Sequence, residues 1–270
     1  QYIDPLLTFY PYGIASYFDT EADRVQKRKI NDLIKPLFKD IVVNNVPSKK
    51  SIAIITARWT PASAVYKSCA CFIKALKDDY DLTLVQLCKP QDNYDKSWFK
   101  DVKVVAFKDN RLDLTPILSN DFALAYFPDI GMQPDDTHLA NLRIAPIQAM
   151  GYGHPVSTFG AEIDYFIGGR NVEVAEKANE NYSERLVLIP GIGADPILPI
   201  PSDLRFKPRE KIAETETETR LVINCPWSAQ KCIYPHLRLL REIADKSTIP
   251  LLFRFFVGGV IQRHNATIPF

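Results

Sequence analysis

The apolar and polar positions of the chain alternate between patterns typical of buried strands and of amphipathic helices. A segment with apolar residues at helical spacing, 62–76, follows the first of several apolar runs. The runs expected to be strands covered on both faces are 51–56, 81–87, 102–107 and 122–129. Because strands that alternate with helices form parallel sheets, residues 47–190 are predicted to form a Rossmann-like α/β lobe.

Two further short strands are predicted in this lobe, at 163–167 and 186–191. Between them and the earlier runs, 139–150 is expected to approach a turn as either a helix or a strand. Residues 1–46 precede the lobe, and their amphipathic part, 25–38, predicts a helical lead-in.

A second β-α-β pattern follows a proline-dense stretch, 191–220, which is predicted to connect two domains. The pattern comprises a strand at 221–225, a helix at 234–245 and a strand at 250–256. A Rossmann-like domain normally has several more strands. Residues 221–270 are therefore expected to be the start of a second lobe that is truncated in this chain.

Composition narrows the class of protein. A chain of 270 residues that is 46% hydrophobic can bury a sizeable core. The net charge of +1, without a long run of Lys or Arg, gives little support to a nucleic-acid or anionic-membrane surface. No apolar segment approaches the length of a membrane span, and the early Asp4 and Pro5 do not suit a signal peptide.

The five cysteines are odd in number and lie mostly in apolar segments, which predicts buried thiols in a cytoplasmic protein. Cys69 and Cys71 lack nearby metal-ligating partners, so core packing is favoured over half a zinc site. Asp79 and Asp81 form an Asp-x-Asp pair where Asp is common in turns. No metal site is expected.

The apolar stretch that begins at Leu142 ends in Gly151, Gly153, His154 and Pro155, which predicts a sharp turn after a buried element. A turn at the carboxyl edge of a parallel sheet is where ligands bind. His154 is therefore a candidate ligand-binding side chain, although a histidine in a turn can equally bind a backbone carbonyl. Two hydroxyl residues that follow are plausible supporting hydrogen-bond groups, Ser157 and Thr158.

This stretch resembles the bacterial cytoplasmic N-glycosyltransferases of the adhesin-glycosylating type and, more distantly, the protein O-linked N-acetylglucosamine transferases of glycosyltransferase family 41. The matching residues run in the family's order through the latter half of the chain. They include Ala145-Pro146-Ile147-Gln148, Gly153-His154-Pro155, Ile163-Asp164-Tyr165, Ser183-Glu184-Arg185-Leu186 and Asn224-Cys225-Pro226-Trp227.

The resemblance implies a GT-B fold of two Rossmann-like lobes and an inverting, metal-independent glycosyltransferase without a cofactor. The donor would be a UDP-hexose, and the acceptor an Asn, Ser or Thr side chain of a protein such as an adhesin. By position, Lys231 and Ser228 match contacts to the nucleotide diphosphate, His154 matches a histidine of the cleft, and Tyr66 is a partial match in the loop after the first strand.

The chemistry of such a transfer explains why a lysine is needed. Negative charge grows on the leaving diphosphate, and an enzyme without a metal stabilises it with fixed cations and oriented amides. Lys231 precedes a predicted helix, whose N-terminal amides would contribute, although a surface lysine at a helix start is common. Gly258 and Gly259 follow a predicted strand and would permit close approach of a ligand, or form a plain turn.

Two departures from the family concern the acceptor side. The segment 56–71 contains no histidine, and Phe159 stands where the family has one. They support an alternative function, that of an inactive or accessory GT-B protein that binds an adhesin or a nucleotide. An ordinary nucleotide-binding Rossmann protein is a weaker alternative, because no GxGxxG or GxxxxGK motif follows any predicted strand.

Overall fold

The structure is a computed structural model. It describes residues 3–18, 20–88, 94–151, 153–173, 176–196, 220–227 and 231–255. The chain divides into two compact units, residues 1–199 and 200–270. The division falls within the proline-dense stretch 191–220.

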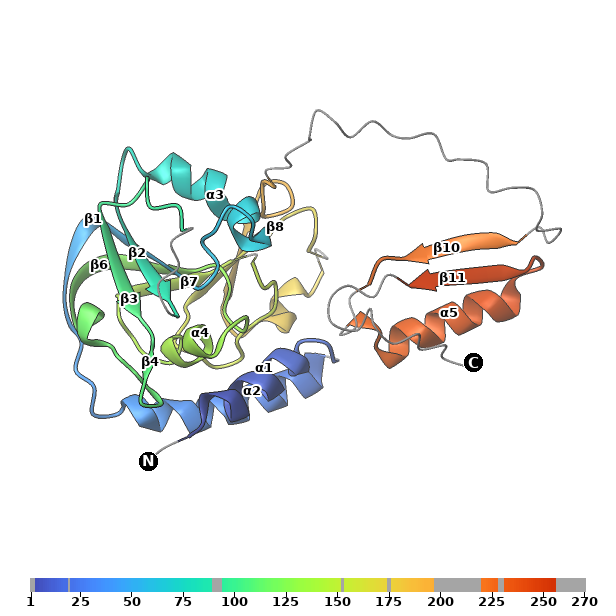
Figure 1. The fold of residues 1–270 in the computed structure, drawn as a ribbon, viewed down its shortest axis with the longest axis horizontal. Helices are drawn as coiled ribbons and strands as arrows, with labels where there is room; N and C mark the ends of the chain where they lie inside the picture. The colour runs from blue at the N-terminus through green and yellow to red at the C-terminus, as the bar shows by residue number, and fades with distance from the viewer. Residues whose placement is uncertain are drawn as a thin grey trace. The chain divides into compact units, whose positions relative to one another are not determined.

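The first unit contains a seven-stranded sheet in the order β3-β2-β1-β6-β7-β8-β9 (Figure 1). All neighbouring strands of this sheet pair in parallel, so their carboxyl ends meet at one edge. The strands are β1 (Asn44–Thr56), β2 (Asp81–Leu87), β3 (Asp101–Val105), β6 (Ser119–Phe127), β7 (Ile147–Met150), β8 (Tyr165–Gly169) and β9 (Arg185–Ile189). The predicted α/β architecture is confirmed.

Some element boundaries differ from the prediction. β1 begins at Asn44, because its polar first part pairs with β6 despite lacking an apolar pattern. The segment 139–150 is mainly an approach to β7, and the helix before it, α4 (Pro134–Leu139), ends where that segment begins. After β3 the chain forms a small antiparallel hairpin of β4 (Phe107–Lys108) and β5 (Arg111–Leu112).

Helices cover both faces of the sheet. Successive residues of a strand point to opposite faces, so Ile54 and Ile55 of β1 report on one face each. Ile55 belongs to a core cluster with residues of α1 (Pro5–Ala15) and α2 (Thr20–Ile34). Ile54 belongs to a second cluster with residues of α3 (Ala64–Leu76). The lead-in is helical as predicted, and its two helices lie side by side (Figure 1).

Local sequence explains where these helices begin. The Asp4 carboxylate accepts the Leu6 backbone N–H at 2.9 Å and caps α1. The Ser63 hydroxyl does the same for α3, accepting from the Val65 backbone N–H at 3.2 Å. The described residues of the first unit also form three short 3-10 helices, η1 (Lys35–Phe38), η2 (Thr115–Ile117) and η3 (Ala178–Asn181).

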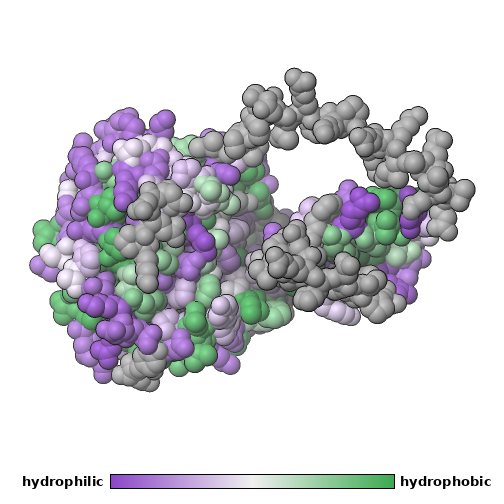
Figure 2. Space-filling model, viewed as in Figure 1, coloured by the Kyte–Doolittle hydropathy of each residue, from purple (hydrophilic) through white to green (hydrophobic). Residues whose placement is uncertain are grey.

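One face of α1 is apolar and exposed. Figure 2 shows hydrophobic side chains on the surface around α1 and α2, among hydrophilic residues that cover much of the same view. The exposed apolar residues of this segment include Leu7, Tyr10, Ile14 and Phe18. Within the described residues, no helix has the length and apolar character needed to cross a membrane.

The described part of the second unit is a single β-α-β element. β10 (Leu221–Cys225) pairs in parallel with β11 (Leu251–Phe255), and α5 (Tyr234–Lys246) connects them. Cys225 of β10 and Leu240 of α5 are buried. The three predicted elements of this unit are confirmed to within one residue at each described end.

Candidate functional site

The predicted turn after the central apolar stretch lies at the carboxyl end of β7, where the chain passes close to β6. A Cβ at Gly153 would lie 2.3 Å from the carbonyl oxygen of Pro128, and one at Gly151 would lie 2.0 Å from the Tyr126 hydroxyl. No side chain fits at these distances. The glycines therefore bring residues 153–159, termed here the His154 loop, against the end of β6.

His154 is held by a side chain of the N-terminal helices. Its Nε2 lies 3.1 Å from the Oγ of Ser16, which is the C-terminal cap of α1. Burial and, to a smaller extent, the nearby positive charge of Lys27 together lower the pKa of His154 to about 4. The imidazole is therefore neutral near pH 7 and can donate or accept one hydrogen bond at each nitrogen, according to its tautomer.

The next part of the loop is fixed by Glu184, which immediately precedes β9. Its carboxylate accepts the Ser157 hydroxyl at 2.7 Å and the Thr158 backbone N–H at 2.9 Å, and it also accepts the Thr158 hydroxyl. Ser157 and Thr158 are each only 1% exposed. Their hydroxyls bond to Glu184 in the protein interior. This arrangement does not support the predicted contact of Ser157 and Thr158 with substrate.

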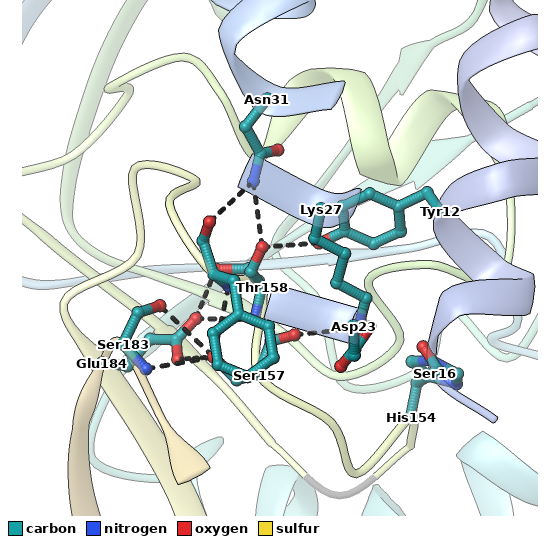
Figure 3. A network of polar contacts seen from close by, with 11 residues as sticks. Tyr12, Ser16, Asp23, Lys27, Asn31, His154, Ser157, Thr158, Ser183 and Glu184 are labelled. Carbon is teal, nitrogen blue, oxygen red and sulfur yellow. Dashed lines mark hydrogen bonds and ion pairs between the residues drawn. The ribbon is translucent and has the colours of Figure 1, made fainter. Parts of the chain in front are cut away.

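Three side chains of the N-terminal helices bind the same loop from its other side (Figure 3). The Lys27 ammonium donates to the carbonyl of Ser157 at 2.9 Å. Asn31 and Tyr12 donate to the carbonyl of Thr158 at 2.9 and 3.3 Å. The His154 loop is thus bound to α1, α2 and the start of β9, and its conformation depends on all three.

Lys27 is fully buried, with an exposure of 0%. Its ammonium lies 3.2 Å from the carboxylate of Asp23, one helical turn earlier, and 5.0 Å from the centre of the Tyr12 ring. Burial lowers the pKa of Lys27, and the charge of Asp23 opposes that shift. No signal in the sequence distinguishes Lys27 from Lys29, the exposed lysine of the same helix.

Phe159, which stands at the position where the predicted resemblance would place a histidine, is 2% exposed and has a φ of +49°. The guanidinium of Arg24 lies 5.6 Å from the centre of its ring, and the ammonium of Lys27 lies 5.9 Å away. A side chain at this position points into the interior beside α2.

Tyr66 lies within α3, not in the loop after the first strand, where the partial match was expected. Its hydroxyl donates to the carboxylate of Asp95 at 2.7 Å. Its ring packs 4.9 Å from the ring of Trp59 and 5.9 Å from that of Trp98. Burial raises the pKa of Tyr66, and the bond to Asp95 adds to the effect. Tyr66 belongs to a buried aromatic cluster.

A second polar group at the carboxyl edge was not identified from the sequence. The Thr56 hydroxyl, at the end of β1, donates to Oδ2 of Asp129 at 2.9 Å. Asp129 has an exposure of 0%, and burial raises its pKa to about 7. Its Oδ1 has no hydrogen-bond partner among the described residues, and neither does the side-chain amide of Gln86, which lies opposite Thr56 on β2. The sequence did contain one signal for this group, because Asp129 is an acidic residue at the carboxyl end of an apolar strand.

In the second unit, Lys231 is exposed and precedes α5, as predicted. Its carbonyl oxygen lies 2.8 Å from Nδ1 of His236. Ile233, the N-cap residue of α5, makes no side-chain capping bond. Pro235 has no N–H, and the N–H groups of His236 and Leu237 both donate to the Ile233 carbonyl, so this helix start offers an anion its dipole more than open amides. The other predicted donor-site residues, Ser228, Gly258 and Gly259, lie outside the described residues.

The described residues contain no candidate metal cluster. No group of three or more His, Cys, Asp or Glu side chains among them could hold a metal ion. A pocket of about 360 Å³ lies in the first unit, between η1 and the β4–β5 hairpin, and is lined in part by Phe38, Arg111 and His138.

No known family profile matches the chain. It is 26% identical over 230 residues to a UDP-glucose:protein N-beta-glucosyltransferase of Actinobacillus pleuropneumoniae serotype 5b, covering 83% of this chain and 35% of that protein. The serotype 7 protein of the same name is 30% identical over 154 residues, covering 56% of this chain and 23% of that protein. The chain thus spans about a third or less of the length of these relatives.

Among solved structures, a mutant O-GlcNAc transferase of Thermobaculum terrenum resembles the chain with a TM-score of 0.57 and 14% identity. The match covers 88% of this chain and 45% of the transferase. It shows a shared fold. The predicted resemblance is confirmed: the chain is similar in sequence to protein N-glucosyltransferases and has the GT-B-like α/β fold of an O-GlcNAc transferase.

Proposed function

We propose that the chain is part of a protein glycosyltransferase that moves a hexose from a UDP-sugar to an Asn side chain, or to Ser or Thr. The observation that carries the proposal is the similarity to protein N-glucosyltransferases over 230 residues. That alignment is longer than either unit, since the first comprises 199 residues. It therefore includes parts of both.

The second unit would bind the donor. Lys231 supplies an exposed cation before α5, and the N-terminal end of that helix supplies the positive end of a helix dipole. Both favour the negative charge that develops on a leaving diphosphate, with Ser228 as a further contact. This arrangement suits an inverting transfer that uses neither a metal nor a cofactor.

The first unit would contribute His154 at the carboxyl edge of its sheet. A neutral imidazole can bind a sugar hydroxyl or a phosphate oxygen without a competing charge. Gly153 permits the close approach of the loop to β6 that places this side chain. The acceptor is proposed to be a protein, such as an adhesin, that the enzyme meets in the cytoplasm.

Mass spectrometry tests the proposal directly. The chain is incubated with an Asn-x-Ser/Thr peptide and UDP-glucose, UDP-galactose or UDP-N-acetylglucosamine, and a hexose-sized addition is expected with one of the first two donors. Lys231→Ala should reduce transfer about 100-fold or more, as loss of one transition-state contact does. Lys246→Ala, at the opposite end of α5, serves as the matched control.

Absence of any addition, combined with measurable UDP binding, would contradict the enzyme proposal. That result would favour the alternative, an accessory GT-B protein that binds adhesin or nucleotide. The specific observation on its side is Phe159, which places a buried ring where the predicted resemblance would place a histidine.

A further inference from the structure

The N-terminal helices contact the His154 loop through polar atoms as well as through apolar packing. Lys27 and Asn31 of α2 donate to the carbonyls of Ser157 and Thr158, at 2.9 Å each. Ser16, at the end of α1, lies 3.1 Å from Nε2 of His154. Figure 3 shows these side chains approaching the loop from the same two helices. The lead-in therefore forms one wall of the candidate site.

A buried lysine is a costly way to hold a loop. Removing an ammonium from water costs several kcal/mol, and an ion pair with one carboxylate does not always offset this cost. An apolar side chain of similar length would fill the space between the rings of Tyr12 and Phe159, which Lys27 occupies. Retaining a charge at this point is therefore better explained by its effect on the loop than by stability.

Ser16 contacts one of the two ring nitrogens of His154. Its Oγ occupies Nε2, whereas Nδ1 makes no hydrogen bond to any residue that the structure describes. The tautomer of an imidazole follows from the bond made by its occupied nitrogen. Ser16 thus contacts Nε2, whereas a ligand would contact Nδ1.

We propose that Lys27 and Ser16 are positioning residues for His154. Lys27 fixes the backbone of the His154 loop through the Ser157 carbonyl, and Ser16 fixes the orientation of the ring, so that Nδ1 is presented to a bound sugar or phosphate group. The binding of a sugar or phosphate group at Nδ1 rests on the proposed glycosyltransferase function. The orientation of the His154 ring by Ser16 and Lys27 does not depend on that function.

The titratable groups around the ring and its loop come from several elements. Lys27 and its partner Asp23 lie on α2, and Glu184 precedes β9. Asp136 of α4 accepts the N–H of Gly131, which packs against the His154 ring. Tyr12, on α1, is a neutral phenol, because burial raises its pKa well above the ordinary value. Removing the charge of Lys27 should raise the pKa of His154, since that charge opposes protonation of the imidazole.

The first test uses ¹⁵N NMR of the imidazole rings in the full chain, with the His154 signals assigned from a His154→Gln variant. Lys27→Met should raise the pKa of His154, and Ser16→Ala should change its tautomer ratio. Lys29→Met, an exposed position on α2, is the matched control and should change neither. Unchanged His154 signals in both folded variants would overturn the proposal. Ser16→Ala keeps the test decisive if Lys27→Met fails to fold.

The second test measures transfer by the same variants with a UDP-hexose and a peptide. A positioning role predicts a fall in kcat of about tenfold or more, with the KM for the donor changed much less. A changed NMR signal without any transfer by the wild-type chain would refute the proposed function and leave the positioning of His154 intact. Normal kcat in both variants would refute the positioning role in catalysis.

Discussion

Glu184 binds the backbone N–H of Thr158 at 2.9 Å, across 26 residues of sequence. The carboxylate also accepts the hydroxyls of Ser157 and Thr158, so one acid satisfies three donors in the interior. Hydrogen bonds to a charged acceptor are among the stronger ones in proteins. This contact connects the start of β9 to the loop that carries His154.

Replacement of Glu184 by Ala should lower the free energy of unfolding by about 3 kcal/mol, because three donors would lose their acceptor in a buried site. Urea unfolding followed by circular dichroism measures the loss. Glu180→Ala, at an exposed position four residues earlier, should cost less than about 0.5 kcal/mol. Equal effects of the two substitutions would show that the Glu184 contacts do not stabilise the loop.

A Gly153→Ala substitution should destabilise the protein and displace the His154 loop, because the new methyl group would lie 2.3 Å from the Pro128 carbonyl oxygen. Gly13→Ala is the control. It lies inside α1, where the added methyl would approach the Gly131 carbonyl oxygen only to 3.5 Å, an ordinary contact. This substitution should raise stability by about 0.5–1 kcal/mol, because alanine is favoured over glycine in a helix. Thermal unfolding compares the two variants.

The buried imidazole of His138 should lower the free energy of unfolding in acid. Its Nε2 lies 2.9 Å from the Thr8 hydroxyl, and burial lowers its pKa to about 4 from an ordinary 6.5. Between these values the unfolded chain binds the proton and the folded chain does not. The contribution of His138 is complete above pH 6.5 and falls by about 1 kcal/mol per pH unit as the pH drops toward 4.

Urea unfolding of wild type and His138→Gln at pH 7, 6 and 5 isolates this contribution. The stability of wild type relative to the variant should decrease as the pH falls. The buried Asp129 and His154 also titrate, but both are present in the two proteins, so they cancel in the difference. A difference that is independent of pH would contradict the assignment.

The buried carboxyl of Asp129 should give the opposite dependence of stability on pH. Burial raises its pKa to about 7 from 3.8, so the folded chain binds the proton more tightly than the unfolded chain. Its contribution is complete below pH 3.8 and is lost as the pH rises toward 7. Asp129→Asn should therefore gain stability relative to wild type between pH 5 and pH 8. Asp32→Asn, exposed on α2, should show no such gain.

Much of the fold follows from local pattern. The strand runs, the helix 62–76 and the second β-α-β element could be read from periodicity, because a buried strand needs continuous apolar residues and a helix needs apolar residues three or four apart. The glycine turn was also readable, since Gly151 and Gly153 mark a close approach of backbone. The polar first half of β1 could not be predicted, because the residues that pair with β6 there show no apolar pattern.

The buried stripe of α2 shows the limit of this reading. Ile30 and Ile34 are buried as their spacing predicts, but Leu33 is 55% exposed. The same stripe continues toward the N-terminus through polar residues, because Asp23, Lys27 and Asn31 face the His154 loop and are buried. Hydrophobic periodicity cannot reveal a stripe whose members are polar.

By itself the sequence determined the order of strands and helices, the position of the central turn and the relatedness to protein glycosyltransferases. Only the tertiary structure decided which polar side chains face that turn. Lys27 and Ser157 are 130 residues apart in sequence, and Thr158 and Glu184 are 26 apart. Local patterns report the preferences of neighbouring residues, whereas a buried hydrogen bond depends on partners that folding brings together.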